Sequence, residues 1–179
     1  MIRQNGALVP GLSAKQIEAV AIAVRRNLGL ENKKLLCMGN FYDLAQENFK
    51  GFSYQVVPCS ELPDDLALAY PSKGLIKIRE DIFDRACSGN GMARFTLAHE
   101  FGHLVLHSGI PLHRAFEPGM KTYRNSEWQA DEFAGSLLMP AEMVNVHDSI
   151  EANSQTFGVS LKAAGVRINN IRRRNEATK

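Results

Sequence analysis

Cysteine is scarce in this sequence, and the few cysteines present form no recognisable pattern. Cys37, Cys59 and Cys87 are three in number, lie far apart and include no CxxC pair. Extracellular proteins stabilised by disulfides carry cysteines in even numbers at short spacings. We therefore exclude a disulfide framework and a cysteine-based metal site, and we expect reduced thiols in a cytoplasmic protein.

Long hydrophobic runs are also absent. The longest, from Ala19 to Val24, is much shorter than the roughly 20 residues that a membrane-spanning helix needs. The first residues lack the basic-then-apolar pattern of a secretory signal. The sequence therefore indicates no membrane segment, which again predicts a cytoplasmic protein.

The chain has little excess charge of either sign. Its 21 basic and 19 acidic residues leave a formal net charge of +2. This balance gives no reason to expect nucleic acid or an anionic membrane as the main partner. With 45% hydrophobic residues among 179, the chain can build a core, and its length suits one domain with a small appendage.

Helix and strand patterns follow one another in an order typical of an α+β protein. Ser13 and Gln16 form a capping-box pattern ahead of a helix that ends at Gly29. We expect the strands that follow to form a small antiparallel sheet packed on a helical domain. The hydrophobic periodicity predicts a short helix through residues 40–49, strands at Phe52–Val57, Leu66–Tyr70 and Leu75–Arg79, a short helix from Glu80, and long helices from about Met92 to Ser108 and from Ser126 to Pro140.

The most informative motif lies in the first of the two long helices. His99, Glu100 and His103 form the pattern HExxH. A spacing of four places both imidazoles on one helical face, so that their nitrogens can converge on one metal ion. Glu100 is offset by about 100° around the helix, from where its carboxylate can reach a water on the metal without being a ligand. The helix is apolar nearly all round and therefore buried, and buried polar side chains need a strong partner such as a cation.

A catalytic zinc site needs a third protein ligand and an open fourth position. His107 lies two turns, or roughly 12 Å, from His99 in a continuous helix, and we expect it to interact with the carbonyl groups at the helix C-terminus. Glu127, in the first turn of the next long helix, is the better candidate. The alternatives are that His113 swings back as the ligand, or that Glu127 is an exposed acid at a helix start.

Asp131 lies one turn beyond Glu127 on the same helical face. A carboxylate there can accept the outer N–H of a ligand histidine and fix its tautomer, as is common around metal sites. We therefore predict that Asp131 orients one of the two histidines. The alternative is an exposed acid that interacts favourably with the helix dipole.

Two stretches of the sequence together resemble the ImmA/IrrE family of metallopeptidases. The first is Arg94–His107, which contains HExxH, and the second is Glu127–Pro140, which contains EWQADEFA and then LLMP. The resemblance covers about half of the chain and implies a zinc site of the thermolysin type. It implies one zinc ion per chain and the following roles: His99, His103 and Glu127 as ligands, Glu100 as catalytic base, and Asp131 as partner of a ligand histidine. Many family sequences have Asn in place of Asp131, and either side chain can orient a histidine.

The resemblance also implies a biological function. Family members typically cleave a helix-turn-helix repressor encoded nearby and thereby switch on mobile-element, prophage or stress genes. We accordingly predict a zinc-dependent endopeptidase with such a repressor as its substrate. The alternative is a non-proteolytic, zinc-containing regulator that binds and sequesters its partner repressor. Glu100 favours the peptidase, because a purely structural site has no use for a base beside the ligands.

Peptide hydrolysis needs two further features. Zinc and one neutral donor would stabilise the oxyanion, and Tyr123, His113 and His107 are the candidates for that donor. The strand Leu75–Arg79 precedes the metal helix. It is either the edge on which an extended substrate adds a strand or an ordinary part of the sheet.

The last part of the sequence predicts a helix-turn-helix-like segment. Phe157–Val159 reads as a tight turn between two helices, and Ser160 as the cap of the second. We expect residues 1–148 to form the zinc metallopeptidase domain and residues 149–179 to form these two helices and a basic tail. With only two helices in evidence, packing or repressor docking is favoured over direct DNA contact.

Overall fold

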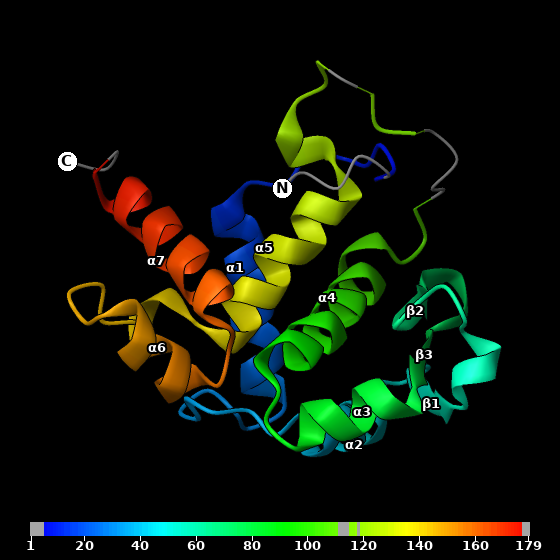
Figure 1. Ribbon diagram of the computed structural model, residues 1–179. Helices are drawn as coiled ribbons and strands as arrows, with labels where there is room; N and C mark the ends of the chain where they lie inside the picture. Colours follow the sequence, from blue (N-terminus) through cyan, green and yellow to red (C-terminus); the bar gives the residue numbers. More distant parts are fainter. Residues whose placement is uncertain (1–5, 111–114, 118, 177–179) are drawn as a thin grey trace.

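The computed structural model describes residues 6–110, 115–117 and 119–176. A small sheet lies on one side of a group of helices (Figure 1), so the predicted α+β class is confirmed. The α-helices are α1 (Ala14–Asn27), α2 (Met38–Asn48), α3 (Glu80–Cys87), α4 (Gly91–His107), α5 (Ser126–Leu138), α6 (Ile150–Phe157) and α7 (Leu161–Glu176). Short 3-10 helices lie at Cys59–Glu61, Pro71–Lys73, Thr122–Arg124 and Ala141–Met143. Within the described ranges, no helix is both long enough and apolar enough to cross a bilayer.

Local signals in the sequence explain where α1 begins and ends. The backbone N–H of Gln16 donates to the hydroxyl oxygen of Ser13, and the backbone N–H of Ser13 donates to the side-chain oxygen of Gln16. This reciprocal pair satisfies N–H groups that a helix start otherwise leaves without partners. Gly29 follows the helix with a φ of 66°, a left-handed conformation that glycine adopts without strain.

The sheet is mixed, which corrects the prediction of an antiparallel sheet. Its strands lie in the order β1 (Ser53–Val57), β3 (Leu75–Arg79), β2 (Ala67–Tyr70). β2 and β3 form an antiparallel hairpin, whereas β1 runs parallel to β3 on its other side. The alternation of apolar residues indicates which face of a strand is buried but not the direction of its neighbour, so the sequence pattern could not distinguish the two arrangements.

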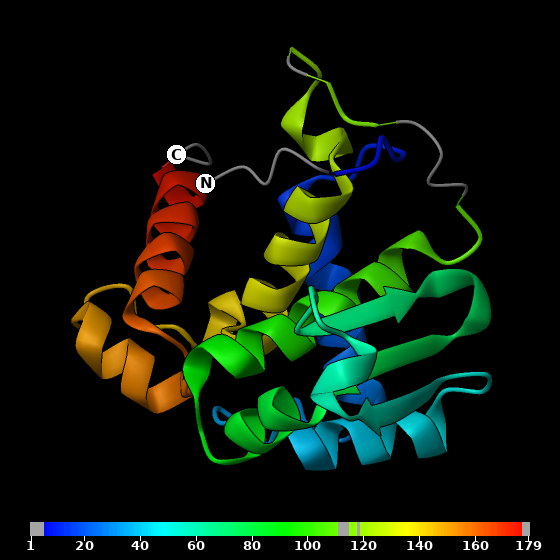
Figure 2. The same cartoon turned by 45° about the vertical axis from the view of Figure 1, so that its right-hand side comes forward.

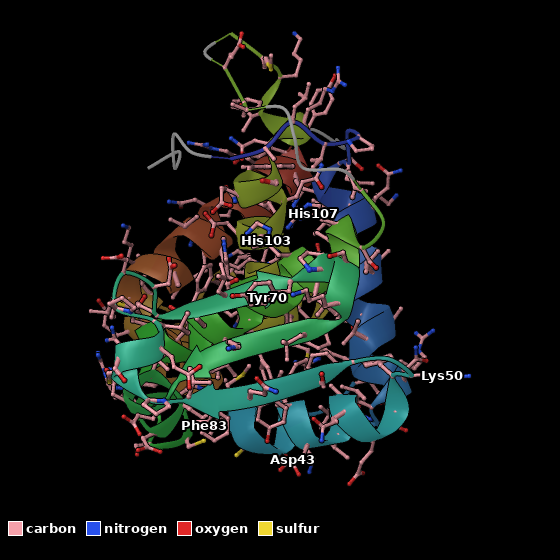
Figure 3. The ribbon with its side chains drawn as sticks, turned by 90° about the vertical axis from the view of Figure 1, so that its right-hand side faces the viewer. Asp43, Lys50, Tyr70, Phe83, His103 and His107 are labelled. Carbon is pink, nitrogen blue, oxygen red and sulfur yellow. The ribbon has the colours of Figure 1, made fainter. Side chains whose placement is uncertain are left out.

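The central position of β3 shows which strands form the edges of the sheet. β3 pairs on both sides, and its Ile76 and Ile78 side chains are fully buried. It is therefore not an edge to which a substrate strand could add, and this alternative from the sequence is wrong. Figure 3 shows the sheet face-on, with β2 on the side of His103 and β1 on the side of Asp43 in α2.

α4 lies between the sheet and α5 (Figures 1 and 2). Leu97 and Phe101 bury the core-facing side of α4 completely or nearly so. Gly102 permits a close approach of α5, because a Cβ atom there would lie only 3.0 Å from the Phe133 ring and 3.3 Å from the Cα of Ala130. This close packing brings the start of α5 beside the HExxH segment.

The N-terminal segment lies alongside the segment that leads into α5. The backbone N–H of Val9 donates to the carbonyl of Arg124 at 2.9 Å, and that of Ser126 donates to the carbonyl of Ala7 at 3.0 Å. Ala7 and Ser126 are 119 positions apart in the sequence. No local pattern predicts this pairing, which places residues 7–12 against the beginning of α5.

The C-terminal helices α6 and α7 are joined by the predicted turn, where Gly158 has a left-handed φ of 61°. Glu18 on α1 forms ion pairs with two arginines of α7. The carboxylate of Glu18 accepts from Arg167 at 2.5 Å and from Arg174 at 2.8 Å. Arg167 also donates to the carbonyl of Met139 at 2.9 Å. Part of the basic charge that the sequence placed on this segment therefore serves packing within the protein.

Candidate metal centre

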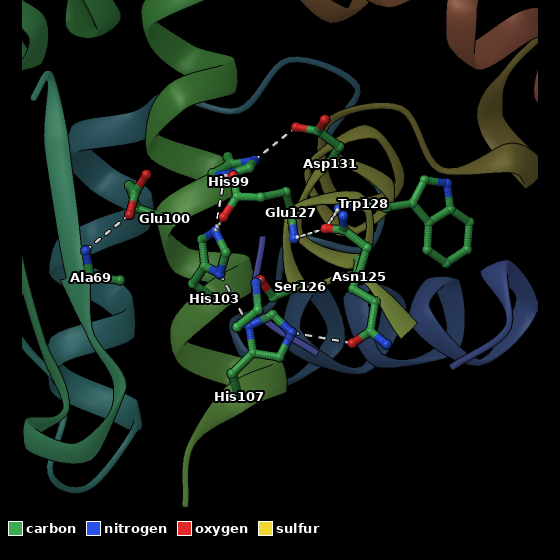
Figure 4. A network of polar contacts seen from close by, with 12 residues as sticks. Ala69, His99, Glu100, His103, His107, Asn125, Ser126, Glu127, Trp128 and Asp131 are labelled. Atoms are coloured by element: carbon green, nitrogen blue, oxygen red, sulfur yellow. Dashed lines mark hydrogen bonds and ion pairs between the residues drawn. The ribbon is translucent and has the colours of Figure 1, made fainter. Parts of the chain in front are cut away.

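The two halves of the candidate site come from α4 and α5. His99 and His103 lie one turn apart on α4 and face the first turn of α5 (Figure 4). The side-chain oxygen of Asn125 accepts from the backbone N–H groups of Glu127 and Trp128 at 2.8 and 3.2 Å. This cap fixes the start of α5 and so the position from which Glu127 reaches α4.

Two imidazoles and one carboxylate converge between the helices. His99 Nε2 lies 3.0 Å from His103 Nε2, Oε2 of Glu127 lies 3.4 Å from His99 Nε2, and Oε1 of Glu127 lies 3.1 Å from His103 Nε2. In a tetrahedral zinc site with bonds of roughly 2 Å, neighbouring ligand atoms are separated by about 3.3 Å. The three side chains therefore fit three corners of a tetrahedron around one zinc-sized ion, which would keep its fourth corner for water or substrate.

His99 is buried and is oriented from the outer side of its ring. Its Nδ1 lies 2.8 Å from Oδ1 of Asp131, one turn beyond Glu127 on α5. Burial alone would lower the pKa of His99, but the hydrogen bonds to Asp131 and Glu127 outweigh burial and raise this pKa to about 9. The surroundings of His99 thus favour a positive charge, as a cation site requires.

Glu127 is held in its ionised form. Burial would raise the pKa of its carboxyl group, but hydrogen bonds with His103 and then His99 outweigh burial and hold this pKa well below its usual range. The ionised carboxylate is the form that binds a metal ion.

Glu100 points away from α5 and towards the sheet (Figure 4). Its Oε2 accepts a hydrogen bond from the backbone N–H of Ala69 on β2 at 2.9 Å. Burial raises the pKa of Glu100, and the positive charges of His99 and His103 offset part of the increase. Among the described residues, His99, His103 and Glu127 form the group that could hold a metal ion, and Glu100 is not one of its members.

His107 is fully buried beside His103. Its Nδ1 lies 3.1 Å from Nδ1 of His103 (Figure 4). Its Nε2 lies 3.2 Å from Oε1 of Gln129. The expectation that His107 contacts the carbonyl groups at the helix end is therefore wrong, because Gln129 on the adjacent helix provides a partner inside the fold. Both ring nitrogens of His107 therefore have partners, His103 and Gln129, and neither carries a free N–H that could donate to an oxyanion.

A sequence model of a peptidase family, described as the IrrE N-terminal-like domain, matches residues 64–169. The match covers more than half of the chain and includes the whole candidate metal group. The chain belongs to the IrrE N-terminal-like peptidase family. This membership confirms the resemblance seen in the sequence and indicates a peptidase. No curated protein matches the sequence closely enough to count as a relative.

The sequence analysis considered two further residues for the chemistry of this IrrE N-terminal-like domain. Tyr123 lies on the 3-10 helix before α5, and its side chain is 47% exposed. Its role as the oxyanion donor stays a prediction. His113 lies outside the residues that the structure describes, so its two suggested roles also stay predictions.

Two groups that contact the site in this family member were missed in the sequence. Gln129 is buried and links His107 to the N-terminal segment. The sequence indicated this role only through the presence of an uncharged polar residue next to the core positions of α5. Ala69 acts through its backbone N–H, which side-chain patterns do not reveal.

Proposed function

We propose that the protein is a zinc-dependent endopeptidase. The observation that carries this proposal is the convergence of His99 Nε2, His103 Nε2 and the Glu127 carboxylate at tetrahedral spacing, with Glu100 beside them. Two histidines and one glutamate are a known ligand set for catalytic zinc in peptidases. Membership of a peptidase family supports the same conclusion.

In the proposed reaction, each side chain around the metal has a separate task. When bound, zinc lowers the pKa of a water molecule and polarises the scissile carbonyl group. Glu100 takes a proton from the attacking water and later delivers it to the leaving amine. Asp131 holds the ring of His99 so that its Nε2 faces the ligand position.

An extended segment of the substrate would pair with the edge of β2. This strand is the sheet edge next to α4, and the N–H of Ala69 faces Glu100 rather than β3. A peptide that pairs here runs alongside α4, with its carbonyl groups close to the metal centre. β2 thus takes the role that the sequence analysis considered for Leu75–Arg79.

The proposed substrate is a helix-turn-helix transcriptional repressor, whose cleavage would derepress mobile-element, prophage or stress genes in the cytoplasm. The resemblance of the motifs supports this choice. For α6 and α7 we favour packing or repressor docking over DNA contact, because Arg167 and Arg174 are already bonded to Glu18. Charged side chains used in this way are not directed at a phosphate backbone.

Glu100→Gln tests the proposed activity. The purified protein would be incubated with the nearest encoded helix-turn-helix repressor, and fragments would be detected by mass spectrometry. We expect this variant to retain one zinc per chain but to cleave at least about 100-fold more slowly, since a positioned base contributes that much or more. Glu47→Gln, at an exposed position on α2, is the control and should cleave at the wild-type rate.

The same assay separates the two candidate functions. Wild-type protein that binds zinc and removes the repressor from its operator without cutting it would support the sequestering regulator. Cleavage by Glu100→Gln at the wild-type rate would contradict the proposed mechanism.

A further inference from the structure

We infer that His107 and Gln129 are positioning residues that determine which nitrogen of His103 carries a hydrogen. They form a neutral hydrogen-bond chain that begins at two backbone carbonyl groups and ends at Nδ1 of His103. The inference rests on the proposed function only in treating His103 as a metal ligand.

The chain begins at Gln129, whose side chain is only 1% exposed. Its Nε2 donates to the carbonyl oxygen of Pro10 at 2.8 Å and to that of Tyr123 at 2.8 Å. Carbonyl oxygens only accept hydrogen bonds, so these two contacts use both amide hydrogens and fix the orientation of the amide. The remaining amide oxygen faces Nε2 of His107 at 3.2 Å.

The amide oxygen of Gln129 in turn fixes the tautomer of His107. An amide oxygen cannot donate, so Nε2 of His107 carries the hydrogen of this contact. In the neutral ring, Nδ1 of His107 is then an acceptor, and it lies 3.1 Å from Nδ1 of His103 (Figure 4). Since two ring nitrogens at this distance share one hydrogen, Nδ1 of His103 supplies it.

With this hydrogen held at Nδ1, Nε2 is the nitrogen that His103 offers to a cation. This nitrogen faces His99 Nε2 at 3.0 Å and a carboxylate oxygen of Glu127 at 3.1 Å, which is the ligand position. Without a hydrogen on Nδ1 of His103, two acceptor nitrogens would face each other at 3.1 Å and the contact with His107 would be lost. The hydrogen-bond chain therefore orients His103 so that Nε2, and not Nδ1, meets a cation.

The two ligand histidines are thus oriented by different chemistry. His99 pairs with the carboxylate of Asp131, whereas His103 pairs with the neutral ring of His107. A carboxylate partner adds negative charge to the site, but a neutral partner fixes orientation without adding charge. Of these two partners, only Asp131 is a carboxylate.

The tautomers can be read directly in metal-free wild-type protein labelled with ¹⁵N-histidine. Long-range ¹H–¹⁵N spectra distinguish protonated from unprotonated ring nitrogens. We expect the hydrogen of His107 on Nε2 and that of His103 on Nδ1. The reverse assignment for either ring would overturn the inference, whatever the protein does with zinc.

Variants then measure the effect on zinc affinity, by titration of the metal-free protein with zinc in a competing chelator. We expect His107→Phe and Gln129→Leu to weaken zinc binding about 10–100-fold, as for other partners of ligand histidines. His107→Asn, whose side-chain oxygen can accept from Nδ1 of His103, should restore most of the affinity. His147→Phe, on an exposed loop, is the matched control and should bind zinc like the wild type.

The possible failures are distinguishable. A folded His107→Phe protein with wild-type zinc affinity would overturn the inference but leave the peptidase proposal intact. A wild-type protein that shows the expected tautomers but binds no zinc would overturn the proposed function instead. If His107→Phe does not fold, Gln129→Leu and the wild-type spectra still decide the matter.

Discussion

The backbone N–H of Ala69 donates to a carboxylate oxygen of Glu100 at 2.9 Å, and this hydrogen bond links the edge strand of the sheet to the HExxH helix. The proposed base is thus held by the main chain of the strand that would bind the substrate. An N–H that faces outward from an edge strand is not part of the sheet ladder. It can therefore be removed without breaking a bond between β2 and β3.

Ala69→Pro removes this donor. We expect kcat for peptide cleavage to fall about tenfold, because Glu100 loses a group that positions it, while zinc binding stays unchanged. Ala67→Pro is the control, since strand alternation directs its N–H to the same side but no bond to Glu100 is formed there. Equal losses of kcat in both variants would show that the effect is a general one on the strand.

Asp131 offers a graded test of how His99 is oriented. Asp131→Ala removes the acceptor that lies 2.8 Å from Nδ1 of His99, and we expect zinc affinity to fall about 10–100-fold. Asp131→Asn retains a side-chain oxygen at this position and should bind zinc within a few-fold of the wild type. Both affinities can be measured by competition with a chelator. An alanine variant that binds zinc as tightly as the asparagine variant would contradict the assigned role.

Tyr54 gives the protein a pH dependence on the alkaline side. Burial and the hydrogen bond to Asp43, at 2.6 Å, raise the pKa of Tyr54 to about 12. A phenol whose pKa is higher in the folded than in the unfolded state contributes stability below the unfolded value of about 10. This contribution is lost as the pH rises from there through 12.

The comparison of wild type with Tyr54→Phe isolates this effect. Urea unfolding at several values between pH 8 and pH 11.5 should show a constant difference in unfolding free energy below about pH 10. Above that pH the wild type should lose stability relative to the variant. A difference that stays constant over the whole range would contradict the raised pKa.

Glu18 is expected to contribute strongly to stability. Its buried carboxylate accepts from Arg167, Arg174 and the backbone N–H of Ala141. Glu18→Gln removes the carboxylate that is hydrogen-bonded to the buried Arg167, and we expect a loss of about 3 kcal/mol in unfolding free energy. Denaturant unfolding measures the loss, with Glu151→Gln at an exposed position of α6 as the reference. Equal stabilities would show that the network makes no net contribution.

The sequence predicted those features that depend on neighbours within one or two helical turns. The capping box at Ser13 and the facing pair His99 and His103 are of this kind, because helical geometry alone determines them. The approach of Glu127 to that pair depends on packing between α4 and α5, and spacing along the chain could only suggest it. The resemblance of the motifs to a known family supplied the prediction that Glu127 is the third ligand.

Features that join distant parts of the chain were not predicted. β1 lies parallel to β3 because the β2–β3 hairpin places β3 next to it, and the periodicity of a strand contains no information on this choice. The buried ring of His107 has the side-chain oxygen of Gln129 as a partner, and the amide of Gln129 in turn donates to the carbonyl of Pro10. Contacts of this kind follow from the tertiary structure and not from any local pattern.

The pairing of residues 7–12 with the start of α5 has a consequence for handling this protein. Pro10 contributes neither a ligand, an acid nor a base, yet its carbonyl oxygen is one of the two anchors of the Gln129 amide. Deletion of the first dozen residues, or a bulky fusion joined directly to them, would therefore disturb a histidine more than ninety positions away. A shortened protein could therefore lose metal although it still contains His99, His103 and Glu127, because the hydrogen bond from Gln129 to Pro10 is missing.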